Sequence, residues 1–277
     1  MAVADSVGGE IVSVDSRQVY RGLDLGTAKP SREDLDRVPH HLIDEADLDT
    51  PLTAGTFAAL ANARIDEITA RGSTPILVGG STLYLHAIAH GIADLPPAIR
   101  LNPLELATPE SRKALYDELA AADPRAAATL DPTKTQRLAR LVGVLRETGV
   151  PPSEHWDRMP PPRHAIRPVV LTRPRPELYA RIEHRVDNMI SGGLVEENRA
   201  LLARGIRMDR PPLNTIGYQE VVPYLEGEID QAEMVRLIKR NTRRYAKRQL
   251  TWFRRQGYPE IPVGPEALPR LLALAEV

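Results

Sequence analysis

The chain has 277 residues, 42% of them apolar, and a formal net charge of −1, which suits one large or two modest domains with apolar cores. It contains no cysteine, which excludes disulfides, thiolate metal sites and a cysteine nucleophile, so chemistry must come from carboxylates, hydroxyls, imidazoles or an oxygen-held metal. No stretch approaches the roughly 18 uncharged apolar residues of a membrane helix. Residues 1–10 lack the basic start and the apolar centre of a signal peptide. We therefore expect a cytoplasmic protein without a membrane partner.

Two short aliphatic runs predict buried parallel strands. The first covers residues 10–14, and the second covers residues 75–78. Between them, residues 53–71 carry apolar side chains at helical spacing and end beside Gly72, a plausible C-cap. Strand, helix and strand in this order predict a βαβ unit and therefore an α/β fold with a parallel sheet.

A long stretch without any strand-like run follows. Residues 109–122 and 136–148 carry amphipathic helical patterns within it. A gap of this length needs structure of its own. We therefore expect a helical insertion over residues 96–135 that leaves and rejoins an α/β core formed by residues 1–95 and 136–277.

The last third of the chain predicts one more strand and two long helices. The strand covers residues 168–172, and amphipathic patterns predict helices over residues 176–204 and 231–254. Nine lysine or arginine residues and no acidic residue lie between positions 236 and 255.

Helical spacing aligns part of this charge. Four of the cations form one stripe, while Met234, Ile238, Tyr245 and Trp252 lie on a different, apolar side. The stripe consists of Arg236, Arg240, Arg243 and Lys247. Such a stripe is typical of a solvated helix face, and it can also follow the phosphates of a nucleic acid. The lack of acidic residues over this length favours an RNA-facing role.

The most informative segment directly follows the first strand. Residues 15–30 read Asp-Ser-Arg-Gln-Val-Tyr-Arg-Gly-Leu-Asp-Leu-Gly-Thr-Ala-Lys-Pro. Asp15 lies at the carboxyl end of a strand, where open α/β sheets place their ligand crevice, and its carboxylate could accept a proton. Gln18 offers a donor and an acceptor suited to an adenine edge. From its position alone, an aspartate after a strand is more often a turn residue or a helix cap.

This segment resembles the signature of the tRNA dimethylallyltransferases. Similar segments follow in order along nearly the whole chain, at residues 38–44, 75–84, 136–140, 181–186, 215–218 and 242–254. The resemblance implies a core related to P-loop NTPases with a helical insertion. It also implies transfer of a dimethylallyl group from dimethylallyl diphosphate to the exocyclic amine of the adenine 3′ of the anticodon in tRNA.

The resemblance also implies roles for individual residues. Asp15 would deprotonate the amine of a base that is flipped out of the anticodon loop. The implied tRNA-binding residues are Asp15, Ser16, Arg17, Gln18, Gln136, Arg137, Arg140, Gly217, Tyr218, Arg243, Lys247 and Arg248. The implied partners are the tRNA anticodon stem-loop and dimethylallyl diphosphate, the implied cofactor is Mg²⁺, and we expect a monomer.

Three further residues are implied to take part in the reaction. Ser81, after Gly79-Gly80, and Arg185 are implied to be catalytic, and Arg181 and Arg185 are implied to bind the diphosphate. From the residues alone, the Gly-Gly-Ser segment is equally consistent with a tight strand-to-helix turn. Two arginines four residues apart on a helix are also typical of a solvated surface.

One part of the family pattern is missing. Family members carry a strand, a Gly-x-x-x-x-Gly-Lys-Ser/Thr loop and a helix before the segment that matches residues 8–10, and this chain has no Gly-Lys pair. We expect the first strand and P-loop to be encoded upstream of Met1, and we expect weak hydrogen-exchange protection at residues 11–14 without them. The alternatives are a catalytically impaired RNA-binding remnant, and an adenine-nucleotide isopentenyltransferase, which would have little use for the cationic helix.

Overall fold

The computed structural model describes residues 1–93, 95, 101–131, 134–206 and 213–275 and divides into two compact units. The first unit comprises Met1–Ala89 and His164–Val277, and the second comprises His90–Arg163. The second unit is longer than the predicted insertion of residues 96–135. Helix α7 (Thr135–Thr148), predicted as part of the core, packs against α5 (Pro109–Ala122) through a shared apolar cluster and therefore belongs with the insertion.

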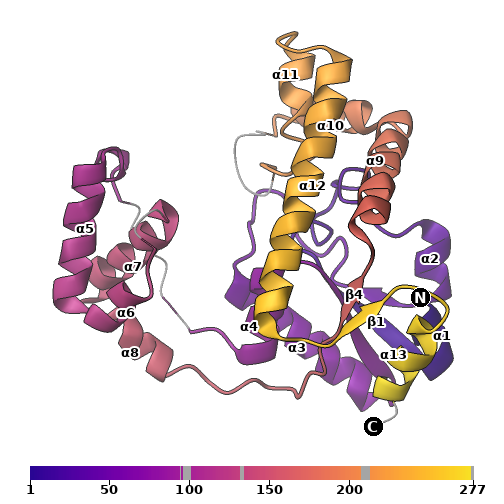
Figure 1. Cartoon of the computed structure of the whole chain (residues 1–277), viewed down its shortest axis with the longest axis horizontal. Helices are drawn as coiled ribbons and strands as arrows, with labels where there is room; N and C mark the ends of the chain where they lie inside the picture. Colours follow the sequence, from indigo (N-terminus) through magenta and orange to yellow (C-terminus); the bar gives the residue numbers. More distant parts are fainter. Residues whose placement is uncertain (94, 96–100, 132–133, 207–212, 276–277) are drawn as a thin grey trace. The chain divides into compact units, whose positions relative to one another are not determined.

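The first unit contains a parallel sheet of three strands in the order β2-β1-β3. Its strands are β1 (Gly9–Val14), β2 (His40–His41) and β3 (Thr74–Gly79). Helix α3 (Ala54–Ala70) connects β2 to β3 and packs against β1 and β3 (Figure 1). The Thr53 hydroxyl caps this helix by accepting from the Thr56 N–H. The predicted βαβ unit is therefore present.

Among the described residues β2 and β3 are the two edge strands of this sheet, and β1 lies between them. Strand β1 is buried at all six positions and is paired on both sides, with Ile11 aligned to His40 and to Ile76. Within the described part of the chain β3 pairs only with β1, and the Val78 side chain is 49% exposed. The described pairings leave no open side at Ile11 and Val12, which was the premise of the weak protection expected at residues 11–14, and the exchange itself stays a prediction.

The third predicted strand lies in a separate sheet. Strand β4 (Val170–Thr172) pairs in parallel with β5 (Glu260–Pro262), a three-residue strand too short to leave a pattern in the sequence. Helix α13 (Ala267–Ala275) follows β5 and packs against α1 (Ala2–Val7), so the first and last described helices lie side by side (Figure 1).

The helix predicted over residues 176–204 is two helices. Helix α9 (Arg175–Ser191) ends at Gly192, and α10 (Leu194–Ala203) begins after Gly193, whose φ of 101° lies in the left-handed region that favours glycine. Helix α12 (Gln231–Gln256) is continuous and packs alongside α9 (Figure 1). Val186, Leu194, Met234 and Ile238 are among the buried side chains shared by these three helices.

Six shorter helices complete the described residues. They are α2 (Arg32–Arg37), α4 (Thr82–His90), the 3-10 helix η1 (Pro103–Leu106), α6 (Pro124–Ala128), α8 (Pro152–Asp157) and α11 (Val221–Leu225). No described helix combines the length and apolar character that a membrane crossing requires.

Candidate active site

Asp15 directly follows β1 and lies at the carboxyl end of the parallel sheet, as predicted. Its Oδ1 accepts from the backbone N–H of Arg17 at 2.8 Å and of Gln18 at 3.3 Å. Among the hydrogen bonds of the described residues none involves Oδ2, so one carboxylate oxygen is available to a ligand. The turn aims and holds the carboxylate while leaving part of it free to accept a proton.

Asp15 lines a pocket of about 320 Å³, here called the smaller pocket. Its walls come from the end of β1, residues 26–27, α9, residues 214–217 and α12. The lining residues are Asp15, Ser16, Arg17, Gly26, Thr27, Arg185, Val186, Met189, Asn214, Thr215, Ile216, Gly217, Ile238, Thr242, Tyr245 and Arg248. Segments far apart in the sequence thus meet around one carboxylate.

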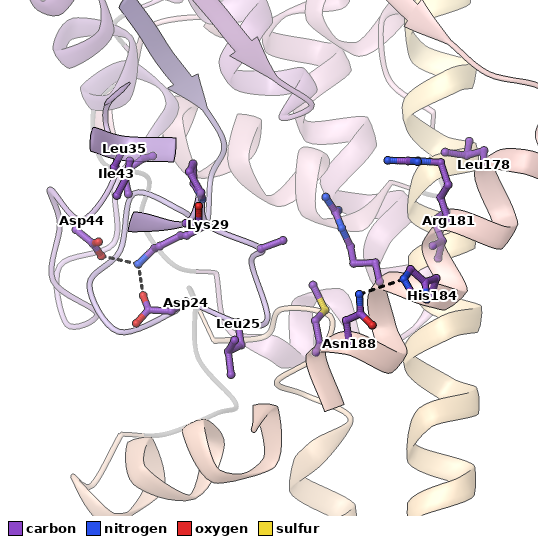
Figure 2. A pocket seen from close by; sticks show the side chains of 16 residues that line it. Asp24, Leu25, Lys29, Leu35, Ile43, Asp44, Leu178, Arg181, His184 and Asn188 are labelled. Carbon is purple, nitrogen blue, oxygen red and sulfur yellow. Dashed lines mark hydrogen bonds and ion pairs between the residues drawn. The ribbon is translucent and has the colours of Figure 1, made fainter. Parts of the chain in front are cut away.

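A second cavity of about 870 Å³, the larger pocket, lies on the other side of residues 24–29. Figure 2 shows Arg181, His184 and Asn188 of α9 facing it, with Asp24, Lys29 and Asp44 at the opposite wall. Its apolar lining consists of Leu25, Ala28, Pro30, Leu35, Ile43, Leu178, Ile182 and Met189. Two residues of α9, Arg185 and Met189, line both pockets.

Lys29 pairs with both acidic side chains of the larger pocket. Its Nζ lies 2.6 Å from Asp24 Oδ1, 2.5 Å from Asp44 Oδ1 and 2.8 Å from the Tyr20 carbonyl oxygen, and its side chain is 7% exposed. Arg181 and Arg185 are exposed and form no ion pair with the described residues. The α9 wall of this pocket therefore carries uncompensated positive charge beside an apolar lining, which favours an anion with an apolar group attached.

Ser81 lies next to Asp15 but lines neither pocket. Its hydroxyl oxygen accepts from the Ser16 N–H at 2.9 Å, and the residue is 7% exposed. A Cβ at Gly79 would lie 2.0 Å from the Val14 carbonyl oxygen, and Gln249 of α12 donates to the Gly80 carbonyl at 2.9 Å. The segment is therefore a tight turn that joins β3, α12 and the Asp15 turn, and a substrate contact of Ser81 stays a prediction.

The side-chain amide of Gln18 is occupied by the protein. Its Nε2 donates to the carbonyls of Thr27 and Ala28 at 3.2 and 3.1 Å, and its Oε1 accepts from the Ser13 hydroxyl at 2.9 Å. Reading an adenine edge with this amide would require some of these bonds to be exchanged. Ser16 and Arg17, predicted with Gln18 as tRNA-binding residues, line the smaller pocket directly.

Gly217 lines the smaller pocket, but the side chain of Tyr218 is fully buried. Its hydroxyl donates to Glu197 Oε1, and burial together with the adjacent Glu197 carboxylate raises the pKa of Tyr218 above its usual range. The predicted contact between tRNA and Tyr218 is therefore wrong for the side chain, which has no exposed surface. Glu197 had no recognisable signal in the sequence, because its partners lie in distant segments.

The predicted cationic stripe on α12 does have acidic neighbours. Arg236 bonds Glu233 in the first turn, and Arg243 donates to Glu183 of α9 at 2.5 Å. Part of the positive charge of this helix is therefore paired, although residues 236–255 contain no acidic residue. Five exposed cations of α12 form no ion pair with described residues: Arg244, Lys247, Arg248, Arg254 and Arg255. The free positive charge thus lies in the second half of the helix, where Arg248 reaches the smaller pocket.

Gln136, Arg137 and Arg140 lie on α7 in the second unit. Gln136 and Arg137 are exposed, while Arg140 Nη2 donates to the Leu95 carbonyl at 3.2 Å. Leu138, between them, is buried in the core of that unit. Their predicted role in tRNA binding is compatible with this exposure and stays a prediction.

The described residues contain no group of three or more histidine, aspartate or glutamate side chains arranged to hold a metal ion. The acidic pair of the larger pocket, Asp24 and Asp44, is committed to Lys29. These residues therefore do not form a Mg²⁺ cage of their own.

The comparisons with known proteins agree on one family. The family model described as IPP transferase matches residues 18–256. The chain is 50% identical over 270 residues to a tRNA dimethylallyltransferase of Salinibacter ruber, covering 96% of this chain and 83% of that protein. It is 44% identical over 271 residues to tRNA dimethylallyltransferase 1 of Trichlorobacter lovleyi, covering 93% of this chain and 88% of that protein.

Solved structures of similar proteins have the same fold. A tRNA isopentenylpyrophosphate transferase from Bacillus halodurans superposes with a TM-score of 0.72 at 36% identity and covers 98% of this chain and 88% of its own. A eukaryotic dimethylallyltransferase acting on tRNA superposes with a TM-score of 0.82 at 23% identity, covering 99% of this chain and 73% of its own. The second likeness supports the α/β fold alone.

Proposed function

The chain belongs to the IPP transferase family, and from this premise we propose that it transfers a dimethylallyl group from dimethylallyl diphosphate to the exocyclic amine of the adenine 3′ of the anticodon in tRNA. The observation that carries the proposal is the position of Arg185. This residue lines both the smaller pocket, which contains Asp15, and the larger pocket, which contains Arg181. A proton acceptor and an anion site therefore lie on either side of one guanidinium.

The flipped adenine is assigned to the smaller pocket. An aromatic amine is a weak nucleophile because its lone pair is delocalised into the ring, so removal of its proton as the new bond forms assists the reaction. Asp15 Oδ2 is the oxygen available for this proton. Ser16, Arg17 and Gly217 line the same pocket and could contact the nucleotide.

Dimethylallyl diphosphate is assigned to the larger pocket. Its apolar residues suit the five-carbon chain, and the unpaired guanidinium groups of Arg181 and Arg185 suit the diphosphate. In the reaction the bond between the amine nitrogen and C1 forms while the bond from C1 to the diphosphate oxygen breaks. The diphosphate leaves with that electron pair, and the amine proton passes to Asp15. Arg185 is placed to stabilise the charge that develops on the leaving group.

The anticodon stem-loop is assigned to the exposed cations of α12, and the tRNA contacts predicted for Gln136, Arg137 and Arg140 of α7 stay a separate prediction. Arg248 connects the cationic half of α12 to the smaller pocket, and its guanidinium lies 5.5 Å from the Tyr245 ring centroid. Lysine and arginine side chains without acidic partners bind phosphates without a competing ion pair. Arg243, which is paired with Glu183, would have to exchange that carboxylate for a phosphate.

Magnesium is proposed to enter with the diphosphate. Mg²⁺ commonly keeps several waters and binds substrate phosphates with only one or two protein carboxylates. This mode of binding is compatible with the lack of a three-ligand cluster among the described residues. Replacing Mg²⁺ by EDTA in the assay should therefore abolish transfer while leaving tRNA binding largely intact.

The test is incubation of the purified chain with unmodified tRNA, dimethylallyl diphosphate and Mg²⁺, followed by nucleoside analysis for a prenylated adenine. The Asp15→Asn variant should lose about 10²- to 10⁴-fold in kcat, the usual contribution of a general base. The control is Asp36→Asn on α2, an exposed aspartate that lines neither pocket. Product with AMP in place of tRNA would favour an adenine-nucleotide transferase. Binding of tRNA without product would favour the impaired remnant.

A further inference from the structure

Residues 24–29, here called the partition segment, separate the two pockets. Asp24, Leu25, Ala28 and Lys29 line the larger pocket, whereas Gly26 and Thr27 line the smaller one. A single short segment thus contributes a wall to each substrate site. Because both walls belong to the same six residues, a shift of this segment changes both sites together.

A carboxylate of α10 holds the partition segment from outside the pockets. Glu197 Oε2 accepts from the Leu25 N–H at 2.9 Å, and Oε1 accepts from the Asp24 N–H at 3.3 Å. The Tyr218 hydroxyl donates to the same Oε1. Three donors on two distant segments therefore converge on one carboxylate, and hydrogen bonds to an ionised acceptor are stronger than neutral ones.

The Tyr218 ring supports the segment from the same side. A Cβ at Gly26 would lie 2.3 Å from Tyr218 Cε2, so the glycine backbone lies directly against the ring. Tyr218 is fully buried, and burial and the Glu197 charge raise the pKa of its hydroxyl above the usual range. The hydroxyl therefore stays protonated at neutral pH and remains a donor to Glu197.

We infer that Glu197 is a positioning residue that fixes the partition segment and so maintains the shape of both pockets. Glu197 lines neither pocket and acts only through the backbone of residues 24–25 and through Tyr218. The assignment of the two pockets to adenine and prenyl diphosphate rests on the proposed function. The mechanical role of Glu197 rests on the contacts alone.

The experiment compares Glu197→Gln with Glu196→Gln. Glutamine keeps the shape of the side chain but places an NH₂ group against at least one of the three donors. Glu196, the adjacent residue of α10, is the control. Its side chain is 69% exposed and lies 3.7 Å from Arg199 in an ion pair at the surface. In Glu197→Gln we expect faster hydrogen exchange of residues 24–29, because the segment opens locally. We also expect kcat/KM to fall about 10- to 100-fold for both substrates, since small misplacements of bound groups are costly.

Tyr218→Phe is the second variant. It removes one donor to Glu197 and leaves the ring beneath Gly26, so we expect a smaller rise in exchange at residues 24–29. The double variant of Tyr218→Phe and Glu197→Gln should lose little more kcat/KM than Glu197→Gln alone, because both substitutions act through the same carboxylate. If Glu197→Gln fails to fold, as judged by thermal unfolding, the exchange of the Asp24 and Leu25 amides in Tyr218→Phe decides the question, because these two amides bond Glu197, whereas the Gly26 amide bonds the Tyr218 hydroxyl itself.

The inference is overturned if Glu197→Gln shows the same hydrogen exchange and the same kinetics as the control variant Glu196→Gln. It is also overturned if hydrogen exchange of the Asp24 and Leu25 amides in Tyr218→Phe equals that of the unmodified chain. Absence of prenylation in the unmodified chain would count against the proposed function. In that case the exchange measurements would still decide whether Glu197 holds the partition segment.

Discussion

Arg181 and Arg185 lie one helical turn apart on α9, yet only Arg185 lines both pockets. Both arginines line the larger pocket, and neither forms an ion pair with the described residues. Because Arg185 lines both pockets, we expect it to act at the reacting centre, whereas Arg181 lines only the larger pocket and should only bind the anion. The two arginines should therefore differ in the kinetic step that they affect.

Arg185→Gln should lower kcat by about 10²-fold, because a donor to the leaving group acts mainly in the transition state. Arg181→Gln should mainly raise the KM for dimethylallyl diphosphate, with a smaller change in kcat. Steady-state kinetics with saturating tRNA would separate the two effects. Arg32→Gln on α2, which lines neither pocket, is the control. Equal kcat values for the variants at positions 181 and 185 would contradict the assignment.

The unpaired cations of α12 should dominate the salt dependence of tRNA binding. Arg244→Gln should reduce the slope of log K against log salt concentration by about 1, the expectation for one lost phosphate contact. Arg236→Gln should change the slope less, because Glu233 already neutralises Arg236. Fluorescence anisotropy with unmodified tRNA over a series of salt concentrations would measure both slopes. A larger change for Arg236→Gln would contradict the placement of the RNA-facing charge.

Glu10 should stabilise the fold at neutral pH and lose this effect in acid. The Arg71 guanidinium bonds both carboxylate oxygens at 2.6 and 2.5 Å, His41 Nε2 lies 2.7 Å away, and these contacts lower the pKa of Glu10 to about 2 despite burial. Since the folded pKa lies below the ordinary value of 4.5, the stabilisation is complete above pH 4.5 and is lost as the pH falls towards 2.

Glu10→Gln should therefore lower the free energy of unfolding by about 1.5–3 kcal/mol at pH 7, the scale of hydrogen bonds to a charged group. The difference from the unmodified chain should narrow progressively below pH 4.5. Urea unfolding at several pH values would measure it, with Asp36→Asn as the exposed control. A difference that is independent of pH would show that the charge of Glu10 is not responsible.

Hydrogen exchange should separate the central strand from the edge strand. The amides of Ile11 and Val12 lie in a strand that is buried and paired on both sides, whereas β3 has one described partner. We therefore expect slower exchange at residues 11–14 than at residues 76–78. Mass spectrometry of overlapping peptides would resolve the two strands. Faster exchange in β1 would contradict the described pairing.

The spacing of apolar residues in the sequence determined much of the secondary structure. The alternation of strand, helix and strand predicted β1, α3 and β3, because buried strands and amphipathic helices leave periodic apolar residues in the sequence. The segment beginning at Asp15 indicated both the position of a carboxylate at a strand end and the family. The break at Gly192-Gly193 could not be predicted from residues 176–204, because the apolar residues on its two sides keep nearly the same helical spacing.

The tertiary structure alone decided which groups meet. Glu183 neutralises Arg243, Glu197 binds both the partition segment and Tyr218, and Arg185 lies between two pockets, although the partners are distant along the chain. Periodicity reports how a side chain is oriented on its own element and contains no information about the element packed against it. Ion pairs, burial and pockets depend on that second element, so they follow from packing between segments and not from the pattern within one.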